Sequence, residues 1–314
     1  MSALELLAMD AGQTGTKVRL RWADGTSRDD LLPGVLTDRP LLPQLADMAE
    51  RIAHVAGDAP TALAIGVSGV TDVHVEAEGL IRRPGLAGVQ RVIVAHDSVT
   101  SFLGVLGDQH GAVIAVGTGV VALGVGPRSA IRVDGWGNIM GDAGSGHWIG
   151  REALDAVMRA HDGRGAATAL TAIVQERWPD LEAAYSVLQA APDRVRLVAS
   201  FSATTAELAA SGDPVALAIC RGAAAELALS VTSALRTTDA PADAPVGAIG
   251  GVLRSDLIRE AFEAKVREVR PEVRFVPPLG TGLDGAAALA DLAPQHPLRE
   301  QSAQAVRTTS EVAA

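Results

Sequence analysis

The chain has 314 residues, 48% of them hydrophobic and 20% charged, and its 27 basic against 37 acidic residues give a formal net charge of −10. This balance argues against a nucleic-acid partner, because a protein that neutralises phosphates needs a basic face. The length allows one or two domains with sizeable hydrophobic cores. The single cysteine, Cys220, excludes a disulfide within one chain and indicates a reducing compartment.

The uncharged segments predict no membrane partner. The longest, residues 111–126, contains five glycines and is shorter than the span of about 20 residues that a helix needs to cross a bilayer. The N-terminus carries no basic segment followed by an apolar stretch, as a secretory signal would. We therefore expect a cytoplasmic protein.

Apolar patterning over the first hundred residues predicts alternating strands and helices. Residues 4–10 and 17–22 are predicted as the two strands of a hairpin, and 41–55 as an amphipathic helix. Buried strands are expected at 61–67 and 91–95. Strands that alternate with helices predict an α/β sheet.

The opening pattern begins again at residue 111. A strand over 112–116, a Gly-Thr-Gly turn and a valine-rich strand that ends at Val125 repeat the first hairpin about a hundred residues later. The repeat predicts two related lobes, residues 1–108 and 109–293.

The rest of the second lobe is expected to be mainly helical. Residues 294–314 are polar and mixed, and we expect a weakly ordered tail or a final helix that crosses back and completes the first lobe. Predicted helices are 151–161, 180–190, 214–236, 255–269 and an alanine-rich helix within 284–290, with a strand at 246–249.

The turn from Asp10 to Thr16, sequence DAGQTGT, joins the strands of the first hairpin. Its glycines let the backbone approach a phosphate, and its amides and hydroxyls supply donors. A carboxylate beside such donors can hold Mg²⁺ through water, because magnesium keeps much of its hydration shell. An ordinary glycine-rich hairpin with a solvated aspartate explains the same residues equally well.

The second turn, from Gly117 to Gly119, has the same alternatives. With Ala122 it matches the G-x-G-x-x-A dinucleotide fingerprint, but the valines that follow predict a returning strand where that fingerprint requires a helix. A phosphate-binding turn and a plain hairpin both remain open. No G-x-x-x-x-G-K-[ST] sequence occurs, which excludes a P-loop.

Asp97 follows the strand at 91–95, so its carboxylate is expected at the carboxyl end of that strand, where open α/β sheets place their chemistry. A carboxylate there can accept the proton of an acceptor hydroxyl during phosphoryl transfer. Alternatively, Asp97 or Ser98 simply caps the helix that follows.

Residues 134–151 form the most unusual segment, with six glycines, two tryptophans and two carboxylates ahead of a helix. Such a loop can face a polyhydroxylated ligand with its backbone and Asp142, while an aromatic ring packs on the ligand's apolar face. A purely structural wedge of Gly135, Trp136 and Gly137 is the alternative.

Gly250 and Gly251 follow the strand at 246–249. Glycines at such a junction let a flat adenine or a ribose lie against the backbone, although a tight strand-to-helix connection explains them as simply.

Taken in this order, these segments resemble the actin-like ATPase superfamily and, within it, the N-acetylglucosamine kinase branch of the BadF/BadG/BcrA/BcrD ATPase family. The resemblance extends over residues 4–290. It implies an α/β fold of two ribonuclease-H-like lobes, with ATP and a sugar in the interlobe cleft and closure on substrate binding.

The resemblance also implies roles for individual residues. Asp97 matches the catalytic carboxylate, Asp10 the aspartate linked to Mg²⁺ through water, and Gly250 and Gly251 the adenosine motif. The phosphate-binding positions are Gly12, Gln13, Thr14, Thr16, Lys17, Gly117, Thr118 and Gly119. The sugar-binding positions are Ser68, Asp97, Thr118, Gly135, Trp136, Gly137, Asp142 and Asp38.

The chain departs from the family pattern at two places near the expected acceptor pocket. Ala143 stands where the family has a glutamate after the second-lobe aspartate. Residues 37–39, Thr-Asp-Arg, stand where the sugar kinases commonly place an asparagine after the first hairpin. The identity of the acceptor is therefore the least determined of these expectations.

The function expected from the resemblance is an ATP-dependent kinase that phosphorylates the 6-hydroxyl of N-acetylglucosamine or a related amino sugar. ATP and Mg²⁺ would be its cofactors and a small-molecule sugar its partner, and a homodimer remains open.

Two alternatives stay beside this expectation. An ATPase switch like the dehydratase activators of the same family would need an iron–sulfur cluster, which takes about two cysteines per chain even when a dimer shares it, and the chain has only Cys220. A catalytically weak sugar sensor is suggested by Ala143.

Overall fold

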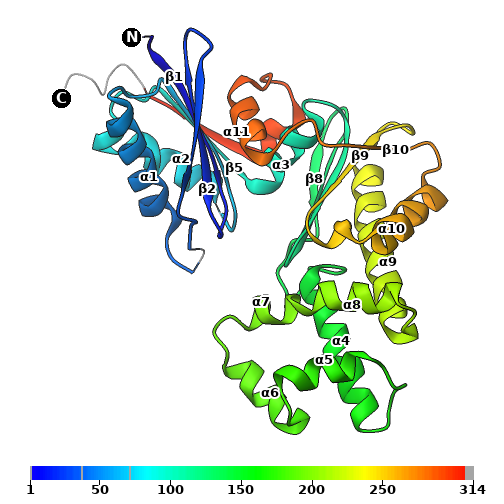
Figure 1. The fold of residues 1–314 in the computed structure, drawn as a ribbon. Coiled ribbons are helices and arrows are strands. Elements are labelled where there is room, and N and C mark those ends of the chain that lie inside the picture. Colours follow the sequence, from blue (N-terminus) through cyan, green and yellow to red (C-terminus); the bar gives the residue numbers. More distant parts are fainter. Residues whose placement is uncertain (1, 37, 71, 308–314) are drawn as a thin grey trace. The chain divides into compact units, whose positions relative to one another are not determined.

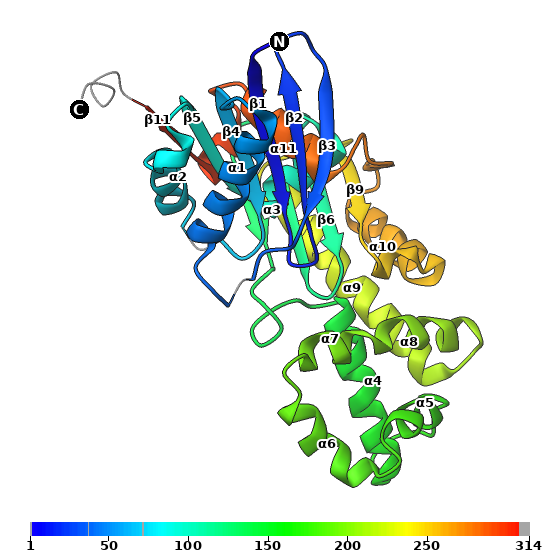
Figure 2. The same cartoon turned by 60° about the vertical axis from the view of Figure 1, so that its left-hand side comes forward.

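The computed structural model describes residues 2–36, 38–70 and 72–307 and divides into two compact units, each built on its own mixed sheet (Figures 1 and 2). Unit 1 comprises the chain up to His110, residues 125–130 and the chain from Pro277 onward. Unit 2 comprises Gly111–Gly124 and Ile131–Val276. The expected α/β class is confirmed, with a parallel core and antiparallel edges in the sheet of unit 1.

The sheet of unit 1 has the strand order β11-β5-β4-β1-β2-β3. The first two strands form the predicted hairpin, and the polar edge strand that follows them was not predicted, because five of its six residues are exposed and carry no apolar pattern. The strands are β1 (Leu4–Ala11), β2 (Thr16–Trp22), β3 (Ser27–Leu32), β4 (Ala62–Val67), β5 (Arg91–His96) and β11 (Ser302–Val306).

Side chains that alternate along β4 give the two faces of this sheet different helices. Leu63, Ile65 and Val67 join the hydrophobic core beneath α1 (Leu41–Ala56) and α2 (Val73–Ile81), a helix that the sequence analysis did not predict. The alternate residues Ala62, Ala64 and Gly66 lie on the opposite face, where their small size lets two helices approach closely. Those helices are α3 (Asp97–Leu106) and α11 (Gly282–Asp291), which lie across the sheet from α1 and α2 (Figure 1).

Backbone contacts between α3 and α11 are possible only because glycines stand at the crossing. A Cβ built on Gly104 would lie 2.0 Å from the Thr281 carbonyl oxygen, and one on Gly285 would lie 1.8 Å from the Thr100 carbonyl oxygen. Because this contact places α11 in unit 1, the expected second lobe of residues 109–293 extends too far: residues from Pro277 belong with the first unit.

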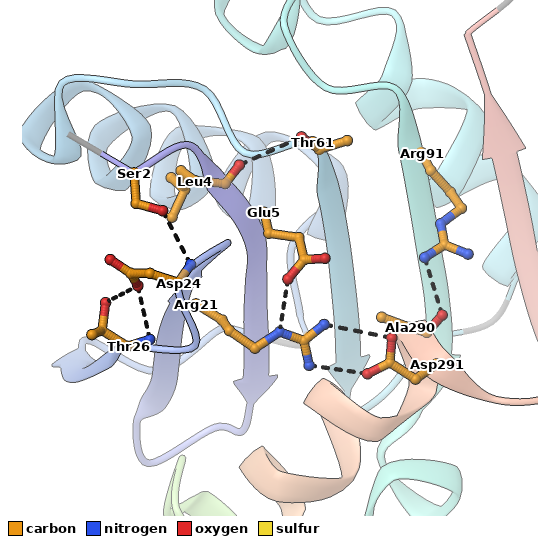
Figure 3. Close-up of polar contacts among 10 residues, drawn as sticks. All are labelled: Ser2, Leu4, Glu5, Arg21, Asp24, Thr26, Thr61, Arg91, Ala290 and Asp291. Carbon is orange, nitrogen blue, oxygen red and sulfur yellow. Dashed lines mark hydrogen bonds and ion pairs between the residues drawn. The ribbon is translucent and has the colours of Figure 1, made fainter.

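Arginines tie the far end of α11 to the sheet (Figure 3). Arg21 of β2 forms ion pairs with Glu5 of β1 at 3.4 Å and with Asp291 at 3.0 Å, and Arg91 of β5 donates to the Ala290 carbonyl oxygen at 3.0 Å. The charged residues that alternate along β2 therefore serve the face that α11 covers, while Val18 and Leu20 enter the core on the other face.

The C-terminal segment differs from the expected tail or helix. After a short 3-10 helix, η3 (Pro297–Gln301), the chain forms β11, which pairs antiparallel with β5 along Ser302–Val306. Alternate burial of Ala303 and Ala305 against the core explains why a strand forms here. Residues 308–314 of the predicted tail lie outside the described residues.

The sheet of unit 2 has the order β10-β9-β6-β7-β8, and its helices form the rest of the unit. The strands are β6 (Gly111–Val116), β7 (Val120–Val125), β8 (Ala130–Val133), β9 (Pro245–Ile249) and β10 (Arg274–Val276). The helices are α4 (Gly146–His161), α5 (Leu170–Arg177), α6 (Leu181–Ala190), α7 (Arg194–Ala199), α8 (Phe201–Ala210), α9 (Pro214–Thr237), η2 (Val252–Arg254) and α10 (Asp256–Val269).

The 24-residue helix α9 is long and apolar enough to pass a test for a membrane span, but it packs as a core helix. Leu227, Val231 and Leu235 on it are fully buried in the core of unit 2. Cys220 is buried on the same helix, and burial raises the pKa of its thiol to about 11. A buried apolar role therefore describes this cysteine.

The crossing of α3 and α11 predicts an unusual response to an added methyl group. Alanine is favoured over glycine inside a helix by about 1 kcal/mol, yet Gly285→Ala places its Cβ on the Thr100 backbone, which cannot move aside. We expect the free energy of unfolding to fall by about 2 kcal/mol or more, measured by urea denaturation. The control is Gly79→Ala on α2, where the new Cβ meets only the flexible end of Leu42. Equal effects of the two substitutions would contradict a rigid backbone contact.

Candidate functional site

In unit 1, Asp10 lies near the end of β1 with its carboxylate against the first turn of α11. A Cβ built on Gly282 would lie 2.7 Å from Asp10 Oδ2. Burial raises the pKa of the Asp10 carboxyl, the charge of Lys17 opposes this rise, and the charge of Asp97 adds to it. Lys17 stands opposite Asp10 in the β1–β2 ladder.

The surroundings of Asp10 fit the expected Mg²⁺. Two carboxylates of unit 1, Asp10 and Asp97, are close enough for the charge of one to raise the pKa of the other, and a cation would relieve that repulsion. Among the described residues, no group of three or more His, Cys, Asp or Glu side chains could hold a metal ion. Mg²⁺ takes one or two carboxylates and completes its shell with water and substrate phosphates.

Asp97 is the first residue of α3, directly after β5. Ser68 Oγ, just beyond the parallel neighbour β4, donates a hydrogen bond of 2.5 Å to Asp97 Oδ2, and His96 Nδ1 lies 2.8 Å from Asp97 Oδ1. The N-cap position is taken by His96, whose ring nitrogen accepts the Ser98 N–H at 3.2 Å. His96 therefore takes the cap position, while Asp97 begins the helix as the alternative expected.

The pKa of Asp97 is lowered overall. Burial alone would raise it, but the contact with His96, the Ser68 hydroxyl and the Ser98 N–H together outweigh burial. The carboxylate is thus held ionised at neutral pH and in a fixed orientation, as an acceptor of a proton must be.

The first turn is held closed by its own backbone. Gly12 N donates to Gly15 O at 3.1 Å, and Val35 N donates to Gly12 O at 3.0 Å. Gln13, Thr14 and Lys17 are exposed, as the phosphate prediction requires. Thr16 differs from that prediction, because its side chain is fully buried and its Oγ1 has no hydrogen-bond partner among the described residues.

In unit 2, the second turn is fixed by the start of α4. Gly146 N donates to Gly117 O at 2.9 Å, and His147 N donates to Thr118 O at 3.0 Å. The chain then returns as the strand β7, which confirms the hairpin and excludes the helix of a dinucleotide fingerprint. Gly117 and Thr118 are exposed.

Asp134 organises the glycine-rich loop, a role that the sequence analysis did not identify. Its Oδ1 accepts from Gly135 N and from Asp142 N, both at 2.7 Å, and its Oδ2 accepts from Ala143 N at 3.0 Å. The backbone is left-handed at Asp134 (φ 58°) and at Asp142 (φ 61°). An aspartate before glycine was the available signal, because aspartate is one of the few side chains that tolerate this conformation.

Asp142 lies against the second turn. Its Oδ1 accepts from Val120 N at 3.4 Å, and a Cβ on Gly119 would lie 2.7 Å from its Oδ2. Burial raises the pKa of Asp142, and the charge of Asp134 adds to the rise. The structure thus brings Asp142 and Gly119, two of the predicted positions, together.

Trp136 projects from the loop and is 57% exposed, so it is not a buried wedge. The guanidinium carbon of Arg132, on β8, lies 4.7 Å from the centre of its ring. Ile139 and Met140 beside it are 91% and 80% exposed. This exposed apolar group can pack on one face of a sugar ring.

Gly251 borders a cavity of about 510 Å³ in unit 2, and Gly250 directly precedes it in the chain. The Gly250 backbone has φ 110°, and a Cβ there would lie 2.2 Å from Val116 O, so only glycine fits. The sequence analysis missed the opposite wall, since α8 is far from the two glycines along the chain. Polar lining residues of this cavity are Ser202, Glu207, Arg254, Ser255 and Asp256.

The remaining predicted position is Asp38. Asp38 lies exposed between β3 and α1. Thr37, the first residue of that departure from the family pattern, lies outside the described residues.

Comparisons with known proteins agree on the family. The model of the BadF/BadG/BcrA/BcrD ATPase family matches residues 44–290. The chain is 27% identical over 246 residues to an N-acetylmuramic acid/N-acetylglucosamine kinase of Clostridium acetobutylicum, covering 73% of this chain and 77% of that protein. A 75-residue stretch is 40% identical to an N-acetyl-D-glucosamine kinase of Dictyostelium discoideum and covers 24% of each chain.

A solved structure from Chromobacterium violaceum, whose name assigns it to the N-acetylglucosamine kinases, superposes with a TM-score of 0.70 at 27% identity. It covers 92% of this chain and 99% of its own.

The bonds to Asp134 predict how the loop responds to substitution. Asp134→Ala removes the acceptor of three N–H groups, so we expect faster hydrogen exchange at Gly135, Asp142 and Ala143, measured by mass spectrometry. Asp134→Asn is the matched control, because asparagine tolerates the left-handed backbone and keeps one oxygen acceptor. It should accelerate exchange less than alanine does. Unchanged exchange in Asp134→Ala would show that other contacts order the loop.

Proposed function

Because this chain belongs to the BadF/BadG/BcrA/BcrD ATPase family, we propose that it is an ATP-dependent sugar kinase that phosphorylates the 6-hydroxyl of N-acetylglucosamine or a related amino sugar. The names of the similar kinases support the substrate class. The observation that carries the proposal is the Asp97 carboxylate at the end of β5, held ionised chiefly by His96 and also by Ser68, whose hydroxyl binds Oδ2.

Asp97 is the proton acceptor in this proposal. As the sugar oxygen attacks the γ-phosphorus, its proton passes to a carboxylate oxygen of Asp97, and the bond between the γ-phosphorus and the bridging oxygen of ADP breaks. The Ser68 hydroxyl donates to Oδ2, and Oδ1 lies 2.8 Å from His96 Nδ1. Ser68 therefore orients the base.

The phosphates are assigned to the two glycine turns and Lys17. In a chain with a net charge of −10, anionic ATP has to be bound by local donors, and the exposed side chains of Gln13, Thr14, Lys17 and Thr118 would supply them. Bound Mg²⁺ supplies positive charge that offsets the charge of the phosphates, and Asp10 would hold it through water.

The adenosine is assigned to the cavity that Gly251 borders. Its volume of about 510 Å³ lies within the range of small-molecule sites. The exposed Arg254 and the half-buried Ser255 offer donors along its wall, while the glycine backbone allows a flat base to approach.

The acceptor is assigned to Asp142 and the exposed ring of Trp136. Ala143, half-buried beside Asp142, has no carboxylate, so the loop carries one negative charge fewer than the family pattern has. An acceptor that itself bears a carboxylate, such as N-acetylmuramic acid, meets less repulsion there.

A coupled assay of ADP release tests the function. We expect ATP consumption that depends on N-acetylglucosamine or N-acetylmuramic acid and exceeds that with glucosamine, N-acetylmannosamine or glucose. The product would be identified as the 6-phosphate by NMR. Consumption of ATP without any sugar would instead support an ATPase switch, and no turnover with bound sugar would support a sensor.

Asp97→Asn tests the assigned base. Asparagine has the shape of aspartate and accepts no proton, so we expect kcat to fall by about 10² or more while nucleotide affinity stays within about twofold. The matched control is Asp108→Asn, an exposed position just beyond the other end of α3, which should leave kcat unchanged. Full turnover in Asp97→Asn would remove the assignment.

Ser68→Ala should move the acidic limb of the pH profile. The Ser68 hydroxyl stabilises the ionised carboxylate, so its loss raises the pKa of Asp97 while burial continues to raise it. More of the base is then protonated at a given acidic pH, and the fall in kcat/KM should begin at a higher pH than in the parent protein. The control is Ser101→Ala, on the helix α3 that begins with Asp97, and it should keep the parent pH profile.

A further inference from the structure

Arg19 joins three elements of unit 1 through one guanidinium group. Its Nε and Nη2 donate to the two carboxylate oxygens of Asp29 on β3, each at 2.7 Å, and its Nη1 donates to Asp284 Oδ1 on α11, also at 2.7 Å. Arg19 and Asp29 are directly opposite in the β2–β3 ladder. The pair with Asp29 therefore fixes the guanidinium on the sheet, and its third nitrogen, Nη1, reaches the helix.

Asp284 passes this restraint to the start of α11. Its Oδ2 accepts from the Thr281 N–H at 2.6 Å and from the Thr281 hydroxyl at 2.8 Å. The Thr281 side chain in turn accepts the Asp284 N–H, which completes the capping box of the helix. The bond from Arg19 is the first cause that lowers the pKa of Asp284 to about 2. Oδ1 of Asp284 therefore binds Arg19 of the sheet, and Oδ2 binds Thr281, the N-cap residue of the helix.

The turn that Asp284 holds is the one that meets Asp10. Gly282 follows Thr281, and a Cβ on it would lie 2.7 Å from Asp10 Oδ2. The preceding residues are bound to α3, since Leu279 N donates to Val105 O at 3.1 Å and Gly280 N donates to Gly104 O at 2.7 Å. Hydrogen bonds to α3 and the ion pair between Asp284 and Arg19 therefore both hold this turn in its position beside Asp10.

We propose that Arg19, acting through Asp284, is a positioning residue that holds the first turn of α11 against the Asp10 carboxylate and so sets the orientation in which Asp10 receives Mg²⁺ with the nucleotide. The inference rests on the proposed function only in taking Asp10 as the aspartate linked to Mg²⁺. Arg19 itself contacts neither phosphate nor metal in this assignment.

Arg21 provides a matched control on the same strand. It lies two residues further along the same face of β2 and pairs with Asp291 at the last residue of α11, as Figure 3 shows. Removing Arg21 therefore deletes an arginine-to-helix ion pair of the same kind and leaves the turn at Gly282 in place.

Calorimetry of nucleotide binding tests the proposal without turnover. ADP is titrated into the full chain with excess Mg²⁺ and again with EDTA, and the ratio of the two affinities measures the contribution of Mg²⁺. We expect Arg19→Ala to reduce this ratio by about tenfold, the lower end of effects seen when the support of a metal ligand is removed. Arg21→Ala should leave the ratio within about twofold, and the affinity without Mg²⁺ should stay unchanged in both variants.

Three further variants separate positioning from loss of stability. Asp284→Ala should reduce the ratio at least as much as Arg19→Ala, because it also removes the helix cap, and the double variant should be no worse than Asp284→Ala, because both substitutions break the same link. Arg19→Lys should fall between the parent and Arg19→Ala, since one ammonium group lacks the fork that reaches two carboxylates. The melting temperatures of Arg19→Ala and Arg21→Ala measure how much thermal stability each substitution removes.

The outcomes are distinct. Equal Mg²⁺ ratios in Arg19→Ala and Arg21→Ala would overturn the positioning role, as would a loss of affinity that is the same with EDTA. Failure to phosphorylate any sugar would remove the proposed acceptor and leave the Mg²⁺ ratios interpretable, because they are measured with nucleotide alone.

Discussion

The close contact of the α3 and α11 backbones is the constraint on which the chemistry of unit 1 depends. Gly104 and Gly285 remove the side chains that would keep these helices apart, and each faces a carbonyl oxygen of the other helix. Asp97 begins α3, and the first turn of α11 meets Asp10. One crossing therefore sets the relative positions of the two carboxylates that we assign to the base and to Mg²⁺.

In unit 2, polar contacts hold the glycine-rich loop of residues 134–151 in one conformation. Asp134 accepts three backbone N–H groups of the loop, and the start of α4 holds the carbonyl groups of the second turn. The Asp142 carboxylate of this loop packs against Gly119 of the second turn. Flexible residues thus become an ordered surface because a few polar groups satisfy their backbone, while Trp136 stays exposed for a ligand.

Much of the fold and part of the site could be predicted from the chain alone. The hairpins, the helix at 41–55 and the long apolar helix had clear periodicity, and the structure has them within a few residues. The polar strand β3 and the last strand β11 carried weak patterns, because an edge strand needs apolar residues on one face at most. The position of Asp97 after a buried strand was predicted, because the apolar pattern of that strand ends just before it.

Other site features depended on contacts between segments far apart in the sequence. No local pattern connects Arg19 with Asp284, 265 residues later, or Gly251 with the residues of α8 across the cavity. Thr16 had the residue type of a phosphate ligand, and only the structure showed its side chain to be fully buried.

By itself, the sequence determined the α/β class, the repeat of a strand, a glycine turn and a returning strand, and the carboxylates available for chemistry. These follow from hydrophobic periodicity and turn chemistry, which act over a few neighbouring residues. Only the tertiary structure decided that α11 returns to unit 1, that Ser68 orients Asp97, and that Arg19 supports the turn beside Asp10. Those relations are set by packing between distant segments, where a missing Cβ or a single hydrogen bond fixes a position that local propensity leaves free.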